Sequence, residues 1–323
     1  MAISIGTFNL NNLFSRFNFS AELDELPPGQ AGGMQITFTP EDVRVRTFMG
    51  RLVRRKGPGE TADIARRILA MDLDVLAVQE VEHIEILREF NRDYLGGLYR
   101  YIALLEGNDP RLIDVGLLSK LRIGAIVSHQ TAEHPERPGE RVFGRDLMQA
   151  EILDDGGAKL LTVYNTHLKS HYVPPGEDQV EGARRANARR RPQAEVTAAI
   201  LTARERKGGR FVVVGDMNDP PGSEALAPML EVDGGILANG LAAAAETRPS
   251  KPESPGQGAG PAHPVWTHRF NPAGTEPPRY ELFDQVWLSP GLAPRLMSAH
   301  IERRSKHGGD GSDHDPAWVV LDL

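Results

Sequence analysis

The chain has 323 residues, of which 40% are hydrophobic, carries a net charge of −7 and contains no cysteine. A chain of this length can bury one large core, so we expect a single domain over residues 1–323, and the missing cysteine excludes disulfides, thiolate metal ligands and cysteine nucleophiles. The acidic balance argues against binding nucleic acid by charge alone, but an acidic enzyme can still hold phosphates through a cation.

Short apolar stretches between turn residues predict strands, and apolar residues at helical spacing predict helices. In chain order these are strand 2–9, helix 61–71, strand 74–79, helix 83–95, strands 99–105, 113–118, 147–153 and 158–166, helix 180–206, and strands 211–215, 282–288 and 316–321. This mixture predicts an α/β fold in which two packed mixed β-sheets are flanked by helices.

Two segments rich in proline and glycine interrupt this pattern, at residues 18–60 and 246–264. Proline and glycine favour turns and loops, and neither segment has the periodicity of a helix or a strand. We therefore expect surface insertions at both places rather than linkers between domains.

Polar side chains stand where several of the predicted strands end or begin. The residues concerned are Asn9, Glu80, His167, Asp216, Asn218, Asp284, Asp313 and His314. Hard cations such as Mg²⁺ prefer oxygen ligands and take only one or two carboxylates from a protein, so Glu80 is our first choice of metal ligand. Together the strand ends predict one polar rim.

The same residues lie in motifs that resemble those of the endonuclease/exonuclease/phosphatase superfamily, which includes pancreatic deoxyribonuclease, and in particular its bacterial nuclease-like members. The resemblance spans residues 3–321. The motifs are Thr7-Phe8-Asn9, Val78-Gln79-Glu80, Asn165-Thr166-His167-Leu168, Gly215-Asp216-Met217-Asn218, Phe283-Asp284 and Ser312-Asp313-His314-Asp315-Pro316. The resemblance implies a four-layer α/β sandwich and a divalent-metal phosphoesterase.

The resemblance also implies roles for the metal-binding and histidine positions. Glu80, with Asn9 and Asp313, would hold Mg²⁺ or Mn²⁺ against a phosphate oxygen. His314 would contact the scissile phosphate or activate water, with Asp284 orienting its ring.

For the remaining catalytic positions, the resemblance implies that Asp216 positions or deprotonates the attacking water and that Asn218 donates to a phosphate oxygen. His167 would stabilise the transition state or assist the leaving group. Asn11 stands where abasic-site endonucleases carry a carboxylate, which weakens an abasic-site assignment and the case for a second complete metal site.

Two arginines in loops next to predicted strands are candidates for substrate binding. Arg111 resembles a phosphate-binding arginine, and the alternative is a loop salt bridge to Asp109 or Asp114. Arg145 could line the cleft or cap the strand that follows it.

Arg184 and Arg185 belong to a basic cluster at the start of the long predicted helix. Such a cluster can follow phosphates beside a cleft, and the alternative is a solvated helix face. A second basic segment ends at Lys56 and could form another edge of the cleft.

We expect a metal-dependent phosphodiesterase, and specifically a nuclease that cleaves DNA by direct in-line attack of water. The first alternative is a phosphatase or a phospholipase C-like enzyme acting on inositol phosphates or sphingolipids, and the second is a non-catalytic binding scaffold. The sequence does not determine whether the substrate is DNA or RNA, or whether cleavage is internal or terminal. It also leaves open whether one metal ion or two are used, and the oligomeric state.

The chain contains no run of eighteen apolar residues, so no membrane segment is predicted. We expect a soluble protein, cytoplasmic as the sequence stands and secreted if a signal peptide has been removed. The absence of cysteine is compatible with either compartment.

Overall fold

The computed structural model describes side chains and backbone over most of the chain. The described ranges are 1–14, 56–109, 111–171, 178–205, 208–247, 265–270, 277–305 and 309–323, together with the backbone of 16–19 and 44–47. The insertions predicted at 18–60 and 246–264 lie mostly outside the described residues, and the first helix begins within the former, at Pro58.

Two large sheets form the centre of the molecule. The first has the strand order β16 (Ala245–Glu246), β20 (Leu296–Ile301), β21 (Ala317–Asp322), β1 (Ala2–Leu13), β4 (Val75–Val81), β6 (Asp114–Ser119) and β5 (Tyr101–Leu105). The second has the order β15 (Ala238–Asn239), β19 (Asp284–Leu288), β12 (Phe211–Asp216), β11 (Lys159–His167), β10 (Met148–Leu153) and β7 (Arg122–Ser128). Both sheets are mixed, because β1 and β4 run parallel in one and β11 and β12 run parallel in the other.

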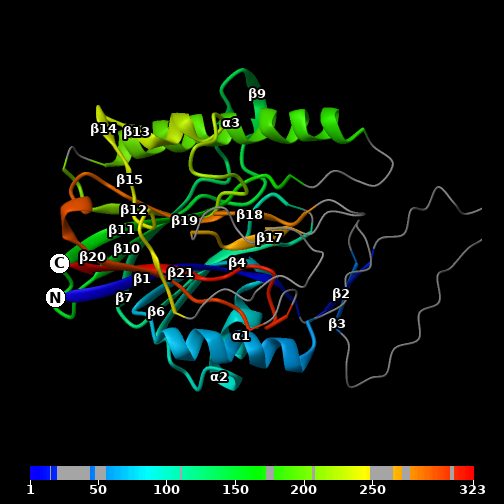
Figure 1. Ribbon diagram of the computed structural model, residues 1–323, viewed down its shortest axis with the longest axis vertical. Helices are drawn as coiled ribbons and strands as arrows, with labels where there is room; N and C mark the ends of the chain where they lie inside the picture. Colours follow the sequence, from blue (N-terminus) through cyan, green and yellow to red (C-terminus); the bar gives the residue numbers. More distant parts are fainter. Residues whose placement is uncertain are drawn as a thin grey trace, which may run out of the picture.

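In the described part of the chain, three α-helices cover the outer faces of these sheets (Figure 1): α1 (Pro58–Met71) and α2 (Ile84–Asp93) lie on the first sheet, and α3 (Gln179–Arg204) lies on the second. The described chain also contains two 3-10 helices, η2 (Ala227–Leu230) and η3 (Ala293–Arg295). The remaining strands form small two-stranded sheets: β2 (Arg16–Phe19) with β3 (Arg44–Thr47), β8 (Glu133–His134) with β9 (Arg137–Arg141), β13 (Glu231–Val232) with β14 (Gly235–Ile236), and β17 (His268–Phe270) with β18 (Arg279–Glu281).

Packing explains this layered arrangement. Between the sheets, Val75 and Val115 of the first pack with Val163 and Val212 of the second, and all four are buried. Separate apolar clusters join each sheet to its helices. Burying an aliphatic side chain contributes about 1.5–3 kcal/mol, so each sheet is held on both faces. The predicted four-layer α/β sandwich is confirmed.

Local signals set the helix starts. Pro58 occupies the first turn of α1, and the Glu60 carboxylate accepts a hydrogen bond from the backbone nitrogen of Gly57, 2.9 Å away. Asp178 caps α3 by accepting from the backbone nitrogen of Glu181 at 2.8 Å. No helix in the described part of the chain is long and apolar enough to cross a membrane.

Four strands of the large sheets, β7, β15, β16 and β20, were not predicted. β7 is an edge strand in which most side chains are exposed or half-buried, and β20 begins with the exposed Leu296 and Met297. β7 therefore shows no clear alternation, β20 buries Ala299 and Ile301 only in its second half, and β15 and β16 are two residues long each. The neighbouring strand supplies the pairing that the sequence pattern does not reveal.

Strand alternation places polar side chains between the sheets at one end of the core. In β1, Ile3 and Ile5 face the inter-sheet core, and Thr7 and Asn9 occupy the next positions of the same face. In β11, Leu161 and Val163 belong to the core and are followed on that face by Asn165 and His167. The core face of three further strands also changes from apolar to polar residues at one end, in β4 at Gln79, in β12 at Asp216 and in β19 at Asp284.

A buried hydrogen-bonded bridge joins the two sheets next to these strand ends. The Thr7 hydroxyl donates to the Gln79 side chain at 3.2 Å, and the Gln79 amide donates to Asn165 at 2.8 Å. Asn165 in turn donates to the backbone oxygens of Val78 and Gly116. Because buried polar groups are costly unless paired, this bridge fixes how the sheet ends face each other.

Gly215 lets β11 and β12 approach closely beside Asp216. Its φ is 137°, and a Cβ there would lie 1.9 Å from the backbone oxygen of Thr166. We therefore expect Gly215→Ala to lower the free energy of unfolding by at least about 3 kcal/mol, since it combines backbone strain with overpacking. Urea denaturation followed by circular dichroism measures this change. Gly222→Ala is the control, because no atom lies within 4 Å of a Cβ at that position; equal midpoints for the two variants would contradict the prediction.

Candidate active site

The centre of the candidate site is one carboxylate oxygen, Asp216 Oδ2. Asn9 Nδ2 lies 2.9 Å from this oxygen, His167 Nε2 lies 3.4 Å from it, and His314 Nε2 lies 3.9 Å from it. All four residues are buried. Asn9 belongs to the first sheet and His314 to the loop before β21, whereas His167 and Asp216 end neighbouring strands of the second sheet. The two sheets therefore supply side chains to a single point.

A buried carboxylate holds the His314 ring. His314 Nδ1 lies 2.7 Å from Asp284 Oδ2, and the backbone nitrogen of Asp284 donates to the Thr267 hydroxyl. Burial opposes a charge on His314, but Asp284 and Asp216 outweigh it and raise the pKa of His314 to about 10. The ring is therefore an imidazolium at neutral pH.

His167 has the opposite electrostatic environment. Burial, with Arg145 and His314 nearby, lowers the pKa of His167 well below its ordinary value. Its Nδ1 is buried and has no hydrogen-bond partner among the described residues. A neutral imidazole donates through one nitrogen only, and a proton on Nε2 faces Asp216. The two histidines thus differ in charge.

Asp216 receives further support from Asn218. The backbone nitrogen of Asn218 donates to Asp216 Oδ1 at 2.9 Å, and its side-chain amide donates to the backbone oxygen of Leu168 at 3.2 Å. Burial is the main cause that raises the pKa of Asp216 to about 6, with Asp284 adding to it and His314 opposing it. A carboxylate with a pKa near neutrality is well suited to accept a proton.

Glu80 lies beside this centre at the end of β4. Its Oε2 accepts from the backbone nitrogen of Asn12 at 3.0 Å, and its Oε1 lies 4.0 Å from His167 Nε2. Burial raises the pKa of Glu80, and the neighbouring Asp313 and Asp216 raise it further. Carboxylates gathered in this way repel one another unless a cation lies between them.

These oxygen donors fit a hard divalent cation. Glu80 and Asp313 are carboxylates. The Asn9 side-chain oxygen accepts a hydrogen bond from the backbone nitrogen of Asn11 at 2.9 Å and has a second lone pair. Mg²⁺ takes such oxygen ligands and keeps several waters. Glu80, Asp313 and Asn9 are therefore the residues that would hold a metal.

Arg111 and Arg145 converge on one aspartate. Arg111 Nη2 lies 2.8 Å from Asp109 Oδ2, and Arg145 Nη1 lies 3.6 Å from the same atom. The salt bridge between Arg111 and Asp109 is the loop alternative foreseen from the sequence. Arg145 is buried and donates to the backbone oxygen of Leu168 at 2.9 Å, whereas the Arg111 side chain is 51% exposed and can also reach solvent.

Lys169 belongs to the same cationic region. Burial lowers the pKa of Lys169 to about 8, and the nearby Arg145, Arg111, Arg189 and Arg190 lower it further. Sequence reasoning gave Lys169 no role. Its position two residues after His167, at the end of β11, is the signal that could have identified it.

Arg184 and Arg185 lie in the first turns of α3. Arg184 forms a two-pronged ion pair with Glu181, 2.9 Å long at both contacts, and its side chain is 77% exposed. This is the arrangement of a solvated helix face. The buried arginine of α3 is instead Arg190, which contacts Asp219 at 3.1 Å and donates to the backbone oxygen of Lys169 at 2.8 Å.

Lys56 and Asp315 also contribute to the surroundings of the site. Lys56 Nζ donates to the backbone oxygen of Gly311 at 2.6 Å. Burial lowers the pKa of Lys56, and the negative charges of Glu60, Glu80 and Asp313 oppose this shift. Asp315 is buried among arginines that fix the loop carrying His314. Asp315 stands in the last sequence motif, but the motif alone does not reveal its partners.

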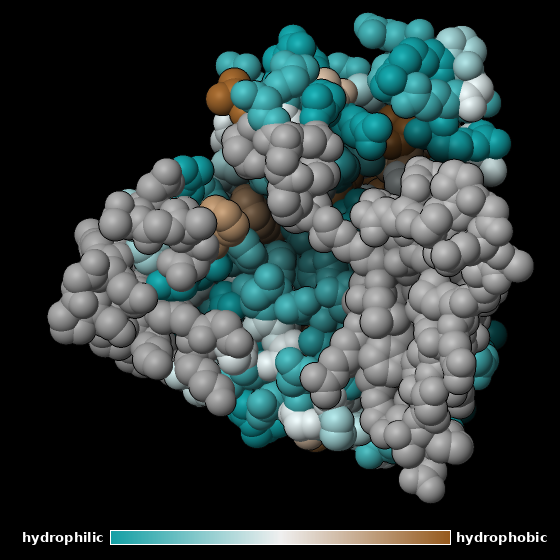
Figure 2. Space-filling view, turned by 90° about the vertical axis from the view of Figure 1, so that its right-hand side faces the viewer, coloured by the Kyte–Doolittle hydropathy of each residue, from teal (hydrophilic) through white to brown (hydrophobic). Residues whose placement is uncertain are grey.

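The end of the molecule opposite the two termini is hollowed. Figure 2 looks at this end and shows a recess whose visible walls are mainly hydrophilic. β1 runs from the amino terminus toward this end, so the carboxyl-terminal part of β1, with Asn9, points to it. A polar recess is suited to a charged substrate.

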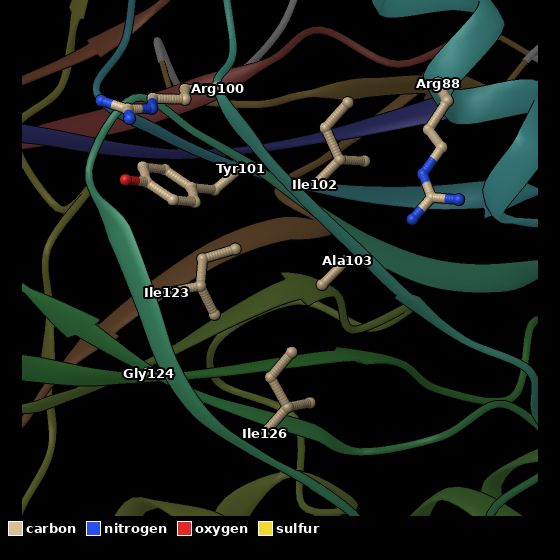
Figure 3. Close-up of a pocket in the computed structure, with 8 residues that line it drawn as sticks. All are labelled: Arg88, Arg100, Tyr101, Ile102, Ala103, Ile123, Gly124 and Ile126. Carbon is tan, nitrogen blue, oxygen red and sulfur yellow. The ribbon is translucent and has the colours of Figure 1, made fainter.

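A separate pocket of about 330 Å³ lies between the edge strands β5 and β7. Figure 3 shows the Arg88 side chain of α2 and Tyr101 of β5 at this pocket, with Ile123 and Ile126 of β7 opposite. None of the residues that line it belongs to the predicted site.

Comparison with solved structures gives the same fold. The chain is similar to an endonuclease/exonuclease/phosphatase protein from Bacteroides vulgatus, with 16% identity, a TM-score of 0.60 and coverage of 100% of this chain and 99% of the other. It is also similar to truncated Caenorhabditis elegans TDP2, with 16% identity, a TM-score of 0.56 and coverage of 100% of this chain and 98% of the other. A third similar structure is D. rerio TDP2 complexed with single strand DNA product, with 15% identity, a TM-score of 0.54 and coverage of 100% of this chain and 99% of the other.

The sequence comparison extends over nearly the whole chain. No curated protein matches it significantly. The profile of the Endonuclease/Exonuclease/phosphatase family matches residues 6–314, a range that contains Asn9 at one end and His314 at the other. Enzymes of this family hydrolyse phosphoester bonds with a divalent metal. The chain belongs to the endonuclease/exonuclease/phosphatase family.

Proposed function

We propose that the protein is a divalent-metal-dependent phosphodiester hydrolase that acts as a nuclease on DNA. The convergence of Asn9, His167 and His314 on Asp216 Oδ2 is the observation that carries this proposal. It places a proton acceptor beside one charged and one neutral imidazole. These are the catalytic groups needed for in-line attack of water on a phosphodiester.

Asp216 orients the attacking water and accepts its proton. Its Oδ1 is held by the Asn218 backbone and its Oδ2 by Asn9, so the carboxylate is fixed before substrate binds. Preorganised groups lower the barrier because they need not rearrange during the reaction.

The two histidines act on the phosphate from different states of charge. His314 is an imidazolium that donates to a non-bridging oxygen, where negative charge accumulates in the transition state. His167 is neutral and donates through Nε2, which stabilises the transition state without adding a charge. Asn218 remains a candidate donor through the second hydrogen of its amide.

A metal ion held by Glu80, Asn9 and Asp313 would neutralise phosphate charge and stabilise the departing oxygen. Mg²⁺ and Mn²⁺ are the ions that we propose, because the donors at this position are oxygen atoms.

Cations beside the site support a nucleic-acid substrate. Arg111, Arg145 and Lys169 are close enough for the two arginines to affect the pKa of the lysine, and the exposed Arg111 can contact a neighbouring phosphate of the same strand. One structural relative, D. rerio TDP2, was solved with a single strand DNA product. We extend that substrate class to this chain as a proposal.

Incubation of the protein with supercoiled plasmid in Mg²⁺ or Mn²⁺ tests the function. We expect conversion to relaxed and linear forms, lost with EDTA and in His314→Ala. His300→Ala is a matched control, because His300 contacts Ser298 and Trp318 and should retain activity. An intact plasmid would contradict the endonuclease proposal and direct the assay to linear ends, RNA, inositol phosphates and lipid head groups.

Asp284→Asn should slow hydrolysis more than it destabilises the fold. The change removes the partner that raises the pKa of His314, so a smaller fraction of that ring is charged, and we expect kcat to fall by about 10²-fold with a smaller change in KM. NMR titration of the His314 ring should show a lower pKa. If the variant unfolds instead, Asp284 acts as a structural buried partner.

A further inference from the structure

We infer that His268, Asp313 and His314 form a second cation site, suited to a borderline transition metal such as Zn²⁺. The candidate ligand atoms of these residues all lie within 4.8 Å of one another. Two of the donors are imidazole nitrogens, which Zn²⁺ accepts and Mg²⁺ avoids. The site shares Asp313 with the oxygen donors at Glu80 but adds two imidazole nitrogens, so its chemistry differs.

The distances suit a bound ion better than direct hydrogen bonds. His268 Nε2 lies 3.8 Å from Asp313 Oδ2, and His314 Nε2 lies 4.0 Å from Asp313 Oδ1. Both separations exceed the hydrogen-bond limit of about 3.2 Å. Around a tetrahedral Zn²⁺ with bonds of about 2.0–2.1 Å, neighbouring ligand atoms lie about 3.4 Å apart, so a small closure of the site would complete three of its four positions.

Both imidazoles are already oriented. Asp284 binds His314 Nδ1 at 2.7 Å, which leaves Nε2 directed at the site and reproduces the carboxylate–histidine arrangement common behind zinc ligands. The His268 ring is stacked on Phe283, with centroids 5.1 Å apart and planes at 16°. His268 and His314 also form a β-bridge, so their backbones are fixed next to each other.

The cluster is open to solvent on the side of its carboxylate. The Asp313 side chain is 49% exposed, so an ion can enter from solvent. Three protein ligands would leave the fourth position of Zn²⁺ open to water or phosphate.

Occupation of this site should inhibit hydrolysis, a consequence that rests on the proposed function. His314 Nε2, the nitrogen that would bind the ion, is also the nitrogen that faces Asp216 Oδ2 at 3.9 Å. A metal on that nitrogen occupies the position from which we propose that His314 donates to phosphate. Zn²⁺ would thus act as an inhibitor in the presence of Mg²⁺.

Calorimetry tests the site without requiring activity. The protein is first freed of bound metal and is then titrated with Zn²⁺ in a buffer that contains excess Mg²⁺. We expect one Zn²⁺ per chain, and Co²⁺ in its place should give the visible absorption of a tetrahedral complex. His268→Asn should weaken binding by more than about tenfold. His171→Asn is the matched control, because His171 stacks on Phe283 at 5.8 Å without belonging to the metal-ligand group.

Glu80→Gln separates the two cation sites. Zn²⁺ binding that persists in Glu80→Gln and is lost in His268→Asn supports the inference. No Zn²⁺ binding, binding unaffected by His268→Asn, or binding lost in Glu80→Gln would overturn it. In the plasmid assay, Zn²⁺ should inhibit the unmodified protein more than it inhibits His268→Asn. Absence of any nicking in Mg²⁺ would contradict the proposed nuclease activity, but the test of Zn²⁺ binding by calorimetry would still be valid.

Discussion

Asp216→Asn is expected to lower kcat/KM for phosphodiester hydrolysis by about 10²–10⁴-fold, the range attributed to a positioned acid or base. The pKa of Asp216 is raised to about 6, so the carboxylate is ionised and still basic near neutrality. An amide of the same shape cannot accept the proton of the attacking water.

Hydrogen-bond geometry adds to this loss. Asp216 Oδ2 accepts from Asn9 Nδ2 and faces His167 Nε2, and its Oδ1 accepts from the Asn218 backbone. An asparagine side chain has one acceptor oxygen and one donor nitrogen. Since donors face both oxygens of Asp216, the amide nitrogen of the substituted side chain would face another donor in either orientation. The remaining activity would come from the metal and the two histidines.

Steady-state hydrolysis of a chromogenic phosphodiester, with circular dichroism to verify folding, measures the effect. Asp233→Asn is a suitable control, since Asp233 is an exposed carboxylate with positive φ in the turn between β13 and β14, a conformation that asparagine also tolerates. A folded Asp216→Asn protein within threefold of the unmodified rate would exclude Asp216 as the base.

The sandwich could be predicted because the alternation of its inner strands is strong. Val212 and Val214 of β12 lie in the inter-sheet core and Asp216 continues their face, so the apolar stretch predicts both the strand and the side on which the carboxylate lies. The same reasoning applies to Asn9 and His167. Asn9 and His167 come together because the two sheets pack face to face, and their roles remain predictions.

Partners distant in sequence could not be predicted in this way. His268 lies 45 residues before Asp313, in a short segment without periodicity, and tertiary contacts such as the bridge to His314 and the stacking on Phe283 bring it to the site. Arginines pose a similar problem, because Arg184 and Arg190 look alike in sequence, yet one is exposed on α3 and the other is buried against Asp219. Burial of a charged residue depends on the tertiary partner that it finds.

Asp315→Asn is expected to lower the free energy of unfolding by about 3–5 kcal/mol, the usual effect of removing one member of a buried charge cluster. Asp315 is fully buried, and its carboxylate lies 3.0 Å from Arg67, 3.2 Å from Arg303 and 3.1 Å from Arg304. The arginine side chains are also buried, so an amide would leave several positive charges without enough compensation.

The same variant should impair hydrolysis through the loop that carries His314. Arg67 donates to the backbone oxygen of His314 at 3.2 Å as well as to Asp315, so it ties the loop to α1. When Asp315 loses its charge, Arg67 keeps Glu302 as its carboxylate partner, and the His314 ring is held less firmly against Asp284. Catalysis is sensitive to displacements of this kind.

Urea denaturation and hydrolysis rates measured on the same preparation test both effects. Asp322→Asn is the matched control, because this carboxylate also belongs to the carboxyl-terminal segment but is 67% exposed and pairs with the amino terminus at the surface. An unchanged urea midpoint in Asp315→Asn would show that other acceptors, such as Glu302 and Glu246, already compensate the arginines. A reduced midpoint with full activity would show that the arginine cluster stabilises the fold without positioning His314.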